Sequence, residues 1–233
     1  MKISGINDSV NEQLFFFTFG ISIKDSCEKK KQKCVEKAYL DFCRTIDYKN
    51  VNRLQKNNYK NQTYKLILDL LEWYPQIDGK NYTLFDDWHC YAIEKMIDKP
   101  KEYQEMFGEL QITVGQAQKW LNMSIKYMRM MGLLNKDIKS EYIHIPIDNY
   151  IIDAARREGK ISELFDVEGL GIMPTFSEKW SKIADYKKYL EYQQAIRQKL
   201  QNRNCNPIEW ESEAWMAEAT VRTEETLKGN KER

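Results

Sequence analysis

A proline followed two residues later by an aspartate, Pro146 and Asp148, is the feature that most constrains how this sequence can fold. Proline fixes its own φ angle and drives the preceding Ile145 toward an extended conformation, so a helix can begin only after it. Asp148 then falls at the N-cap, where its carboxylate accepts backbone N–H groups and the helix dipole favours a negative charge. The sequence therefore predicts an extended segment that ends in a carboxylate at the start of a helix.

An amphipathic helix is predicted upstream, between Val114 and Gly132. Its apolar positions recur with helical spacing and form one face: Ala117, Leu121, Ile125 and Met128. Lys119, Asn122 and Lys126 share another face. We therefore expect this helix to pack inward while it carries an amine and an amide along one stripe.

Strand signals are scarce, so the sequence predicts a mainly α-helical fold. The aromatic segment from Gln13 to Ile23 is the exception, because it fits either a small N-terminal β element or the start of a buried helix. Residues 1–219 are expected to form one globular domain, or two subdomains that flank a substrate cleft, with a hairpin and catalytic region at 100–157. The charged residues 220–233 are expected to fray.

Two connecting regions also receive predictions. The asparagine- and lysine-rich residues 48–62 are expected to form a polar connection after the preceding helix or a solvent-facing turn. Residues 175–199 are expected to form one helical unit with an N-terminal cap near Ser177 to Trp180.

Composition narrows the classes of function. Lys and Arg number 36 against 35 Asp and Glu, a net charge of +1, which argues against a protein that binds phosphates mainly by non-specific attraction. Five irregularly spaced cysteines and two histidines favour neither an iron–sulfur cluster nor a zinc site, so no cofactor or metal is expected. The sequence contains no apolar run of about 18 residues and no signal-peptide pattern. We expect a cytoplasmic protein without a membrane segment, and a monomer.

The turn at Gly115, the lysine-bearing helix after it and the I-P-I-D motif of Ile145 to Asp148 resemble the helix-hairpin-helix (HhH-GPD) DNA glycosylase superfamily. The closest likeness is to its 8-oxoguanine glycosylase branch, over about forty residues at motif level. The resemblance implies a multi-helix glycosylase fold and a double-stranded DNA partner that contains an oxidised or otherwise modified base. It also implies that Asp148 is the catalytic aspartate and that Lys119 is the amine that forms a Schiff base with the sugar.

The turn from Leu110 to Gly115 departs from the family pattern, because it keeps only one of the two usual glycines. Ala117 stands where the family places its lysine, and Lys119 follows two residues later, about 200° further around the helix. Either the hairpin is remodelled so that Lys119 faces the pocket, or the enzyme lacks a lyase lysine. Both a monofunctional glycosylase and a glycosylase with abasic-site lyase activity stay open.

Further residues are assigned to binding. The backbone N–H groups of Val114, Gly115 and Gln116 are expected to contact a DNA phosphate, because glycine permits close approach, although a helix cap explains the glycine as well. Asn122 and Met123 are candidate pocket residues. His89 is expected to satisfy a local hydrogen bond. The alternative function is a non-catalytic helical protein that retains the hairpin for binding DNA or a partner, and a helical scaffold without a nucleic-acid role is a third.

Overall fold

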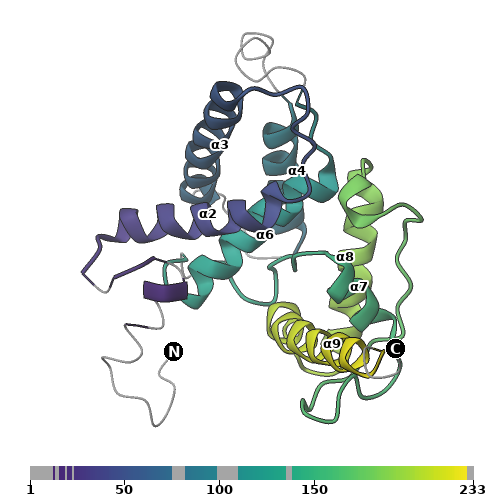
Figure 1. Ribbon diagram of the computed structural model, residues 1–233. Helices are drawn as coiled ribbons and strands as arrows, with labels where there is room; N and C mark the ends of the chain where they lie inside the picture. The colour runs from purple at the N-terminus through teal and green to yellow at the C-terminus, as the bar shows by residue number, and fades with distance from the viewer. Residues whose placement is uncertain are drawn as a thin grey trace. The chain divides into compact units, whose positions relative to one another are not determined.

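The computed structural model describes residues 13, 16–18, 20–22, 24–74, 82–98, 110–134 and 138–229. Within these ranges it defines eight helices and no sheet, with one isolated β-bridge between Lys160 and Glu168. The helices (Figure 1) are α2 (Cys27–Cys43), α3 (Arg53–Trp73), α4 (Tyr82–Ile97), α6 (Val114–Met130), α7 (Asn149–Arg156), the 3-10 helix η2 (Trp180–Lys182), α8 (Tyr186–Gln201) and α9 (Pro207–Gly229). The prediction of a mainly α-helical protein is confirmed.

Two predicted segments are only partly within the described ranges. In the N-terminal aromatic segment, Gln13 and residues 16–18 are helical, and the side chains of Phe16 and Phe17 are 54% and 82% exposed. The helical residues described in this segment do not fit the alternative strand, and the exposed Phe16 and Phe17 do not fit the start of a buried helix. The first helix of the predicted hairpin, from Pro100 to Leu110, lies outside the described residues except for Leu110.

The chain divides into two compact units. Unit 1 comprises residues 1–112 and 116–138, and unit 2 comprises residues 113–115 and 139–233. The division crosses the predicted hairpin and catalytic region, so that Lys119 belongs to unit 1 and Asp148 to unit 2.

Trp120 of α6 lies at the centre of the aromatic core of unit 1. Its ring stacks on Phe42 of α2, with centroids 4.7 Å apart, and lies 5.1 Å from Tyr39 of the same helix. Its indole N–H donates to the carbonyl oxygen of Val35 at 3.1 Å. A buried tryptophan has one polar group to satisfy, and this bond satisfies it while joining α6 to α2.

The first three turns of α6 are buried on every side. The predicted apolar face is confirmed, because its members are at most 1% exposed: Ala117, Leu121, Ile125 and Met128. Polar residues on the other faces are equally buried, including Gln118, Asn122 and Ser124. A helix that is buried around its whole circumference belongs to the interior of a protein, where polar side chains need hydrogen-bond partners.

The predicted polar connection over residues 48–62 is wrong, because α3 begins at Arg53. Asn52 and Gln55 form a capping box at this point. The Asn52 side chain accepts from the N–H of Gln55 at 2.9 Å, and the Gln55 side chain accepts from the N–H of Asn52 at 3.0 Å. The box satisfies free N–H groups of the first turn, and so a polar sequence starts a helix here.

The prediction for residues 175–199 is wrong at its start. α8 begins at Tyr186, after Asp185, whose carboxylate accepts from the N–H of Lys187 at 2.9 Å. Only the short η2 helix precedes it in this segment. Aspartate is among the strongest N-cap residues, and its position sets the start of the long helix.

α9 continues to Gly229, so residues 220–229 form its last turns, and the fraying of this charged end stays a prediction. Arg222, within this part of α9, forms ion pairs with Glu218 one turn earlier and with Asp153 of α7. Among the described helices, none is both long enough and apolar enough to cross a membrane.

Candidate functional site

Asp148 is the N-cap residue of α7, which confirms the prediction from Pro146. Its backbone is extended, with φ −147° and ψ −177°, and its Oδ1 accepts a 3.0 Å hydrogen bond from the N–H of Ile151. Residues 142–147 before it are all buried, and Asp148 itself is half-buried. A carboxylate is therefore fixed by a helix terminus at the end of a buried, extended segment.

Gln193 of α8 holds the extended segment just before Asp148. Its Oε1 accepts from the N–H of Ile145 at 3.1 Å, and its Nε2 donates to the carbonyl oxygen of Ile145 at 2.7 Å. Nε2 also donates to the Tyr189 hydroxyl at 3.1 Å, and that hydroxyl lies 3.2 Å from Nδ1 of His144. All these residues are buried. One side chain thus satisfies both backbone groups of Ile145 away from water, where unpaired groups are costly.

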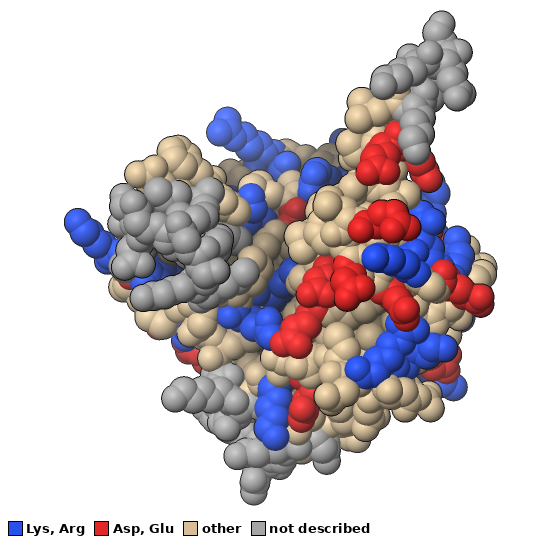
Figure 2. Space-filling model, turned by 90° about the horizontal axis from the view of Figure 1, so that it is seen from below, with Lys and Arg blue, Asp and Glu red and all other residues tan. Residues whose placement is uncertain are grey.

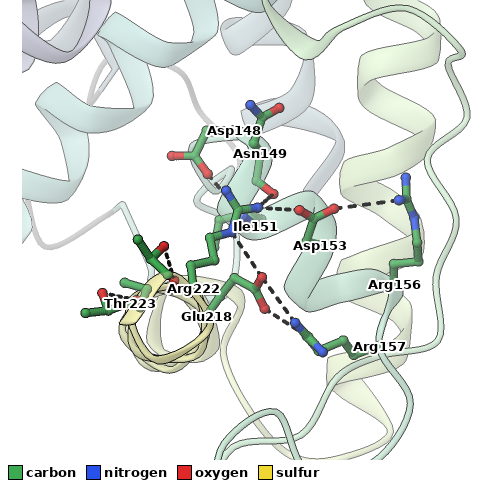
Figure 3. A network of polar contacts seen from close by, with 11 residues as sticks. Asp148, Asn149, Ile151, Asp153, Arg156, Arg157, Glu218, Arg222 and Thr223 are labelled. Atoms are coloured by element: carbon green, nitrogen blue, oxygen red, sulfur yellow. Dashed lines mark hydrogen bonds and ion pairs between the residues drawn. The ribbon is translucent and has the colours of Figure 1, made fainter. Parts of the chain in front are cut away.

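Charged residues of α9 bind α7, the helix that follows Asp148 (Figure 3). Arg222 donates from Nη2 to the carbonyl oxygen of Asn149 at 3.2 Å and to the Asp153 carboxylate, and from Nε to Glu218 at 3.2 Å. Glu218 is 2% exposed and also accepts two hydrogen bonds from Arg157, at 2.8 and 3.3 Å. A buried carboxylate needs such partners, and here two guanidinium groups supply them.

The electrostatics of this network raise the pKa of both arginines above its already high ordinary value. The hydrogen bond to Glu218 is the main cause that raises the pKa of Arg157 above its usual value. Burial lowers the pKa of Arg222, but the Glu218 hydrogen bond and the charge of Asp153 outweigh it, so the pKa is again raised. An open cavity of about 460 Å³ is lined by the charged residues of the network: Asp153, Arg156, Arg157, Glu218, Arg222 and Glu225.

Lys119 lies on α6 within unit 1 and is 7% exposed. This exposed fraction is low for a lysine, since charged side chains are rarely buried without partners. One turn further, Asn122 is fully buried, donates to Gln118 at 3.1 Å and lies 2.9 Å from Nε2 of His89. His89 therefore has a hydrogen-bond partner, as predicted, but the partner lies 33 residues away on α6 rather than nearby in the sequence. Met123 is 8% exposed, so both candidate pocket residues lie in the interior of unit 1.

The predicted phosphate-binding residues open α6. The N–H of Gly115 donates to the carbonyl oxygen of Ile183 at 3.0 Å, and a Cβ atom at this position would lie 1.8 Å from the carbonyl oxygen of Trp180. Val114 is 5% exposed, and the Gln116 side chain donates to the carbonyl oxygen of Thr45 at 2.6 Å. A close backbone approach does require glycine at position 115. In the structure Trp180 makes that approach, and contact with a DNA phosphate stays a prediction.

Lys and Arg side chains are interspersed with Asp and Glu on the face that Figure 2 draws, as the net charge of +1 leads us to expect. Within the described ranges, no three His, Cys, Asp or Glu side chains gather closely enough to hold a metal ion. All five cysteines are free thiols, and burial raises the pKa of Cys34 to about 12.

Sequence reasoning missed Gln193, Arg222 and Glu218. The four-residue spacing of Glu218 and Arg222 indicates an ion pair on one helix face, which is the only signal available. Their partners on the segment around Asp148 lie 48 to 73 residues away along the chain.

Comparisons of the chain with protein-family models, with curated proteins and with solved structures found no match in any of the three. The function of the site around Asp148 therefore has to be inferred from its own residues.

Proposed function

We propose that this protein is a DNA glycosylase that releases an oxidised or otherwise modified base from double-stranded DNA. One observation carries the proposal: Asp148 is a half-buried N-cap carboxylate. The segment before it is hydrogen-bonded to Gln193, and the short helix after it is hydrogen-bonded to Arg222. A fixed negative charge stabilises the positive charge that develops on a sugar when its glycosidic bond breaks. The resemblance of Ile145 to Asp148 to the proline-and-aspartate motif of HhH-GPD glycosylases supports the same role.

In the proposed reaction the modified nucleotide first flips out of the duplex. The bond between C1′ of the deoxyribose and the base nitrogen breaks, and its electron pair leaves with the base, which takes up a proton. The Asp148 carboxylate stabilises the cationic sugar. Water then adds to C1′ and loses a proton, so that the products are a free base and an abasic site.

Lys119 is the proposed nucleophile if the enzyme also has abasic-site lyase activity. Its neutral amine would attack C1′ in place of water and form a Schiff base, which permits elimination of the 3′ phosphate. The resemblance, which implies a Schiff-base lysine on this helix, supports the role. Asn122 and Met123 are proposed to line the pocket because they follow Lys119 on the same buried helix.

A non-catalytic helical protein that binds DNA or a partner is the second candidate. The near-balanced charge of the chain and the turn at Gly115, which keeps only one of the family's two glycines, favour it. Such a protein would bind duplexes with an affinity that falls as salt rises, and it would release no base.

Base release from duplexes that each carry one modified base, beginning with 8-oxoguanine, tests the proposal. Asp148→Asn keeps a side-chain oxygen that can cap the helix, because asparagine caps as well as aspartate, but it removes the charge. We expect base release, measured by alkaline cleavage of the abasic product, to fall at least about 100-fold. Thermal unfolding and duplex binding should stay unchanged.

Asp185→Asn is the matched control, because it removes the charge from the exposed N-cap of α8. It should release base at the wild-type rate. Full activity in Asp148→Asn would contradict the proposal. Salt-dependent duplex binding without base release from any substrate would favour the second candidate.

Trapping with borohydride tests Lys119 separately. On a duplex with an abasic site, a covalent adduct should form in the wild type and in Lys126→Gln, and should be lost in Lys119→Gln. Base release by the wild type without any adduct would instead identify a monofunctional enzyme.

A further inference from the structure

Arg222 contacts the first two turns of α7 through several groups (Figure 3). Nη2 donates to the carbonyl oxygen of Asn149 at 3.2 Å and to Oδ2 of Asp153, while Nε donates to Glu218 of its own helix. The guanidinium carbon also lies 4.2 Å from the centre of the Tyr150 ring. Arg222 therefore holds both the backbone and the side chains of the N-terminal part of α7.

The contact with Asn149 acts next to the candidate catalytic group. Asn149 directly follows Asp148, and the peptide bond between them is planar and stiff. The position of Asn149 therefore restrains the backbone of Asp148, and the bond from the Ile151 N–H to Oδ1 restrains the carboxylate itself.

α7 depends on such contacts because it has only eight residues. Isolated helices of this length are not stable in water, so tertiary contacts have to fix its axis. These contacts come from α9, which is much longer, with 23 residues. On α9, the buried Glu218 accepts hydrogen bonds from both Arg157 and Arg222, and its bond to Nε restrains the Arg222 guanidinium.

We propose that Arg222 is a positioning residue that orients the Asp148 carboxylate by holding the first turn of α7, with Glu218 as its support. The inference rests on the proposed role of Asp148 in base release. Catalytic groups have to be held within about 0.5 Å of the productive geometry, and a displacement of about 1 Å can cost about 100-fold in rate. Loss of Arg222 therefore slows the chemical step rather than weakening the binding of DNA.

Single-turnover base release with enzyme in excess separates the chemical step from binding. Arg222→Met keeps an unbranched stem and removes every donor, and we expect it to lower the single-turnover rate at least about tenfold at an unchanged Kd for DNA. Arg203→Met is the matched control, since the Arg203 and Arg222 side chains are 33% and 32% exposed and Arg203 pairs with Glu168, outside α7. It should change neither quantity. Arg222→Lys should recover only part of the rate, because an ammonium lacks the planar fork of donors.

Amide hydrogen exchange gives a second readout that does not need activity. The Ile151 amide bonds to the Asp148 carboxylate, and the Lys187 amide bonds to the Asp185 carboxylate in the corresponding cap of α8. Arg222→Met should accelerate exchange at Ile151 by about tenfold or more and leave Lys187 unchanged.

The possible outcomes are distinct. Unchanged exchange at Ile151 in Arg222→Met would overturn the inference, and so would faster exchange with an unchanged single-turnover rate. If the wild type releases no base from any duplex, the proposed function fails, whereas exchange at Ile151 still decides whether Arg222 orients Asp148. If Arg222→Met does not fold, the same two measurements on Arg222→Lys decide the question.

Discussion

α7 and α8 both begin with an aspartate N-cap, but the rest of unit 2 holds them in different ways. Asp148 accepts from the N–H of Ile151 and Asp185 from that of Lys187, so the local chemistry of the two caps is alike. α7 is attached to α9 by charged side chains that line an open cavity. The inner face of α8 is instead buried, and next to Asp148 it is bonded to Ile145 through the neutral side chain of Gln193, while Arg197 donates to the carbonyl oxygen of Tyr142 further along the segment.

This difference separates the role of the helix cap from the role of the tertiary contacts around it. Cap chemistry sets the residue at which a helix begins, whereas tertiary contacts decide how firmly the carboxylate is aimed and how far water reaches it. Asp185 is exposed, while Asp148 follows six buried residues and is itself half-buried. Of these two carboxylates, Asp148 has the partial burial that the proposed role requires, and Asp185 does not.

The neutral attachment by α8 should carry the largest contribution to stability. Gln193→Leu leaves the buried N–H and carbonyl groups of Ile145 without their partner, so we expect a loss of about 3 kcal/mol in the free energy of unfolding. Urea denaturation followed by circular dichroism measures it. Gln198→Leu, at an exposed position of α8, should change stability by less than about 0.5 kcal/mol. A loss no larger than in this control would show that α8 does not hold the segment.

The charged attachment of α7 should be weaker and sensitive to salt. Glu218→Gln leaves Arg157 and Arg222 without their shared carboxylate, for an expected loss of about 2 kcal/mol. Because these arginine side chains are 39% and 32% exposed, added salt should screen the ion pairs. Urea denaturation at low salt and in about 1 M NaCl should therefore show a smaller salt effect in Glu218→Gln than in the wild type. Glu224→Gln, at an exposed position, should keep the salt dependence of the wild type. If the free energy of unfolding depended on salt equally in all three proteins, the ion pairs of Glu218 would not be what attaches α7.

The two caps themselves should contribute equally. Asp148→Ala and Asp185→Ala each remove one side-chain acceptor from a first helical turn, and each should lower the free energy of unfolding by about 1 kcal/mol. Urea denaturation of both variants at neutral pH measures the difference between them. A loss much larger at Asp148 would mean that its surroundings add to the cap energy, and the local equivalence of the two helices would then be wrong.

The signals that predict α7 and the apolar face of α6 are local. A cap and a helical period depend on residues at most a few positions apart, and Asp148 after Pro146 supplies such a signal. The same kind of signal misled at α3, where a polar sequence conceals the capping box of Asn52 and Gln55.

The long-range pairings could not be predicted. Gln193 bonds to Ile145 across 48 residues and Arg222 to Asp153 across 69, and no spacing rule relates residues so far apart. Gly115 illustrates the limit, because the need for a close approach follows from the missing Cβ atom, whereas its partner Trp180 follows only from the fold.

Tyr192 and Tyr189 provide the smallest and last test, on the buried face of α8. The Tyr192 hydroxyl is buried and has no hydrogen-bond partner among the described residues, whereas the Tyr189 hydroxyl bonds to Gln193 and lies 3.2 Å from Nδ1 of His144. At neutral pH, Tyr192→Phe should therefore change the free energy of unfolding by less than about 0.5 kcal/mol. Tyr189→Phe should lower it by about 1 kcal/mol.

The pH dependence of the Tyr192 variant has a definite sign. Burial is the main cause that raises the pKa of Tyr192 above its ordinary value near 10. As the pH rises above 10, the unfolded chain releases this proton while the folded protein retains it, so the wild type loses stability. Tyr192→Phe lacks that loss, and its stability relative to the wild type should rise between pH 9 and pH 11, measured by urea denaturation. If the difference in free energy of unfolding between Tyr192→Phe and the wild type were constant over this range, water would reach the Tyr192 hydroxyl. The inner face of α8 would then not be fully buried, and its contrast with α7 would be lost.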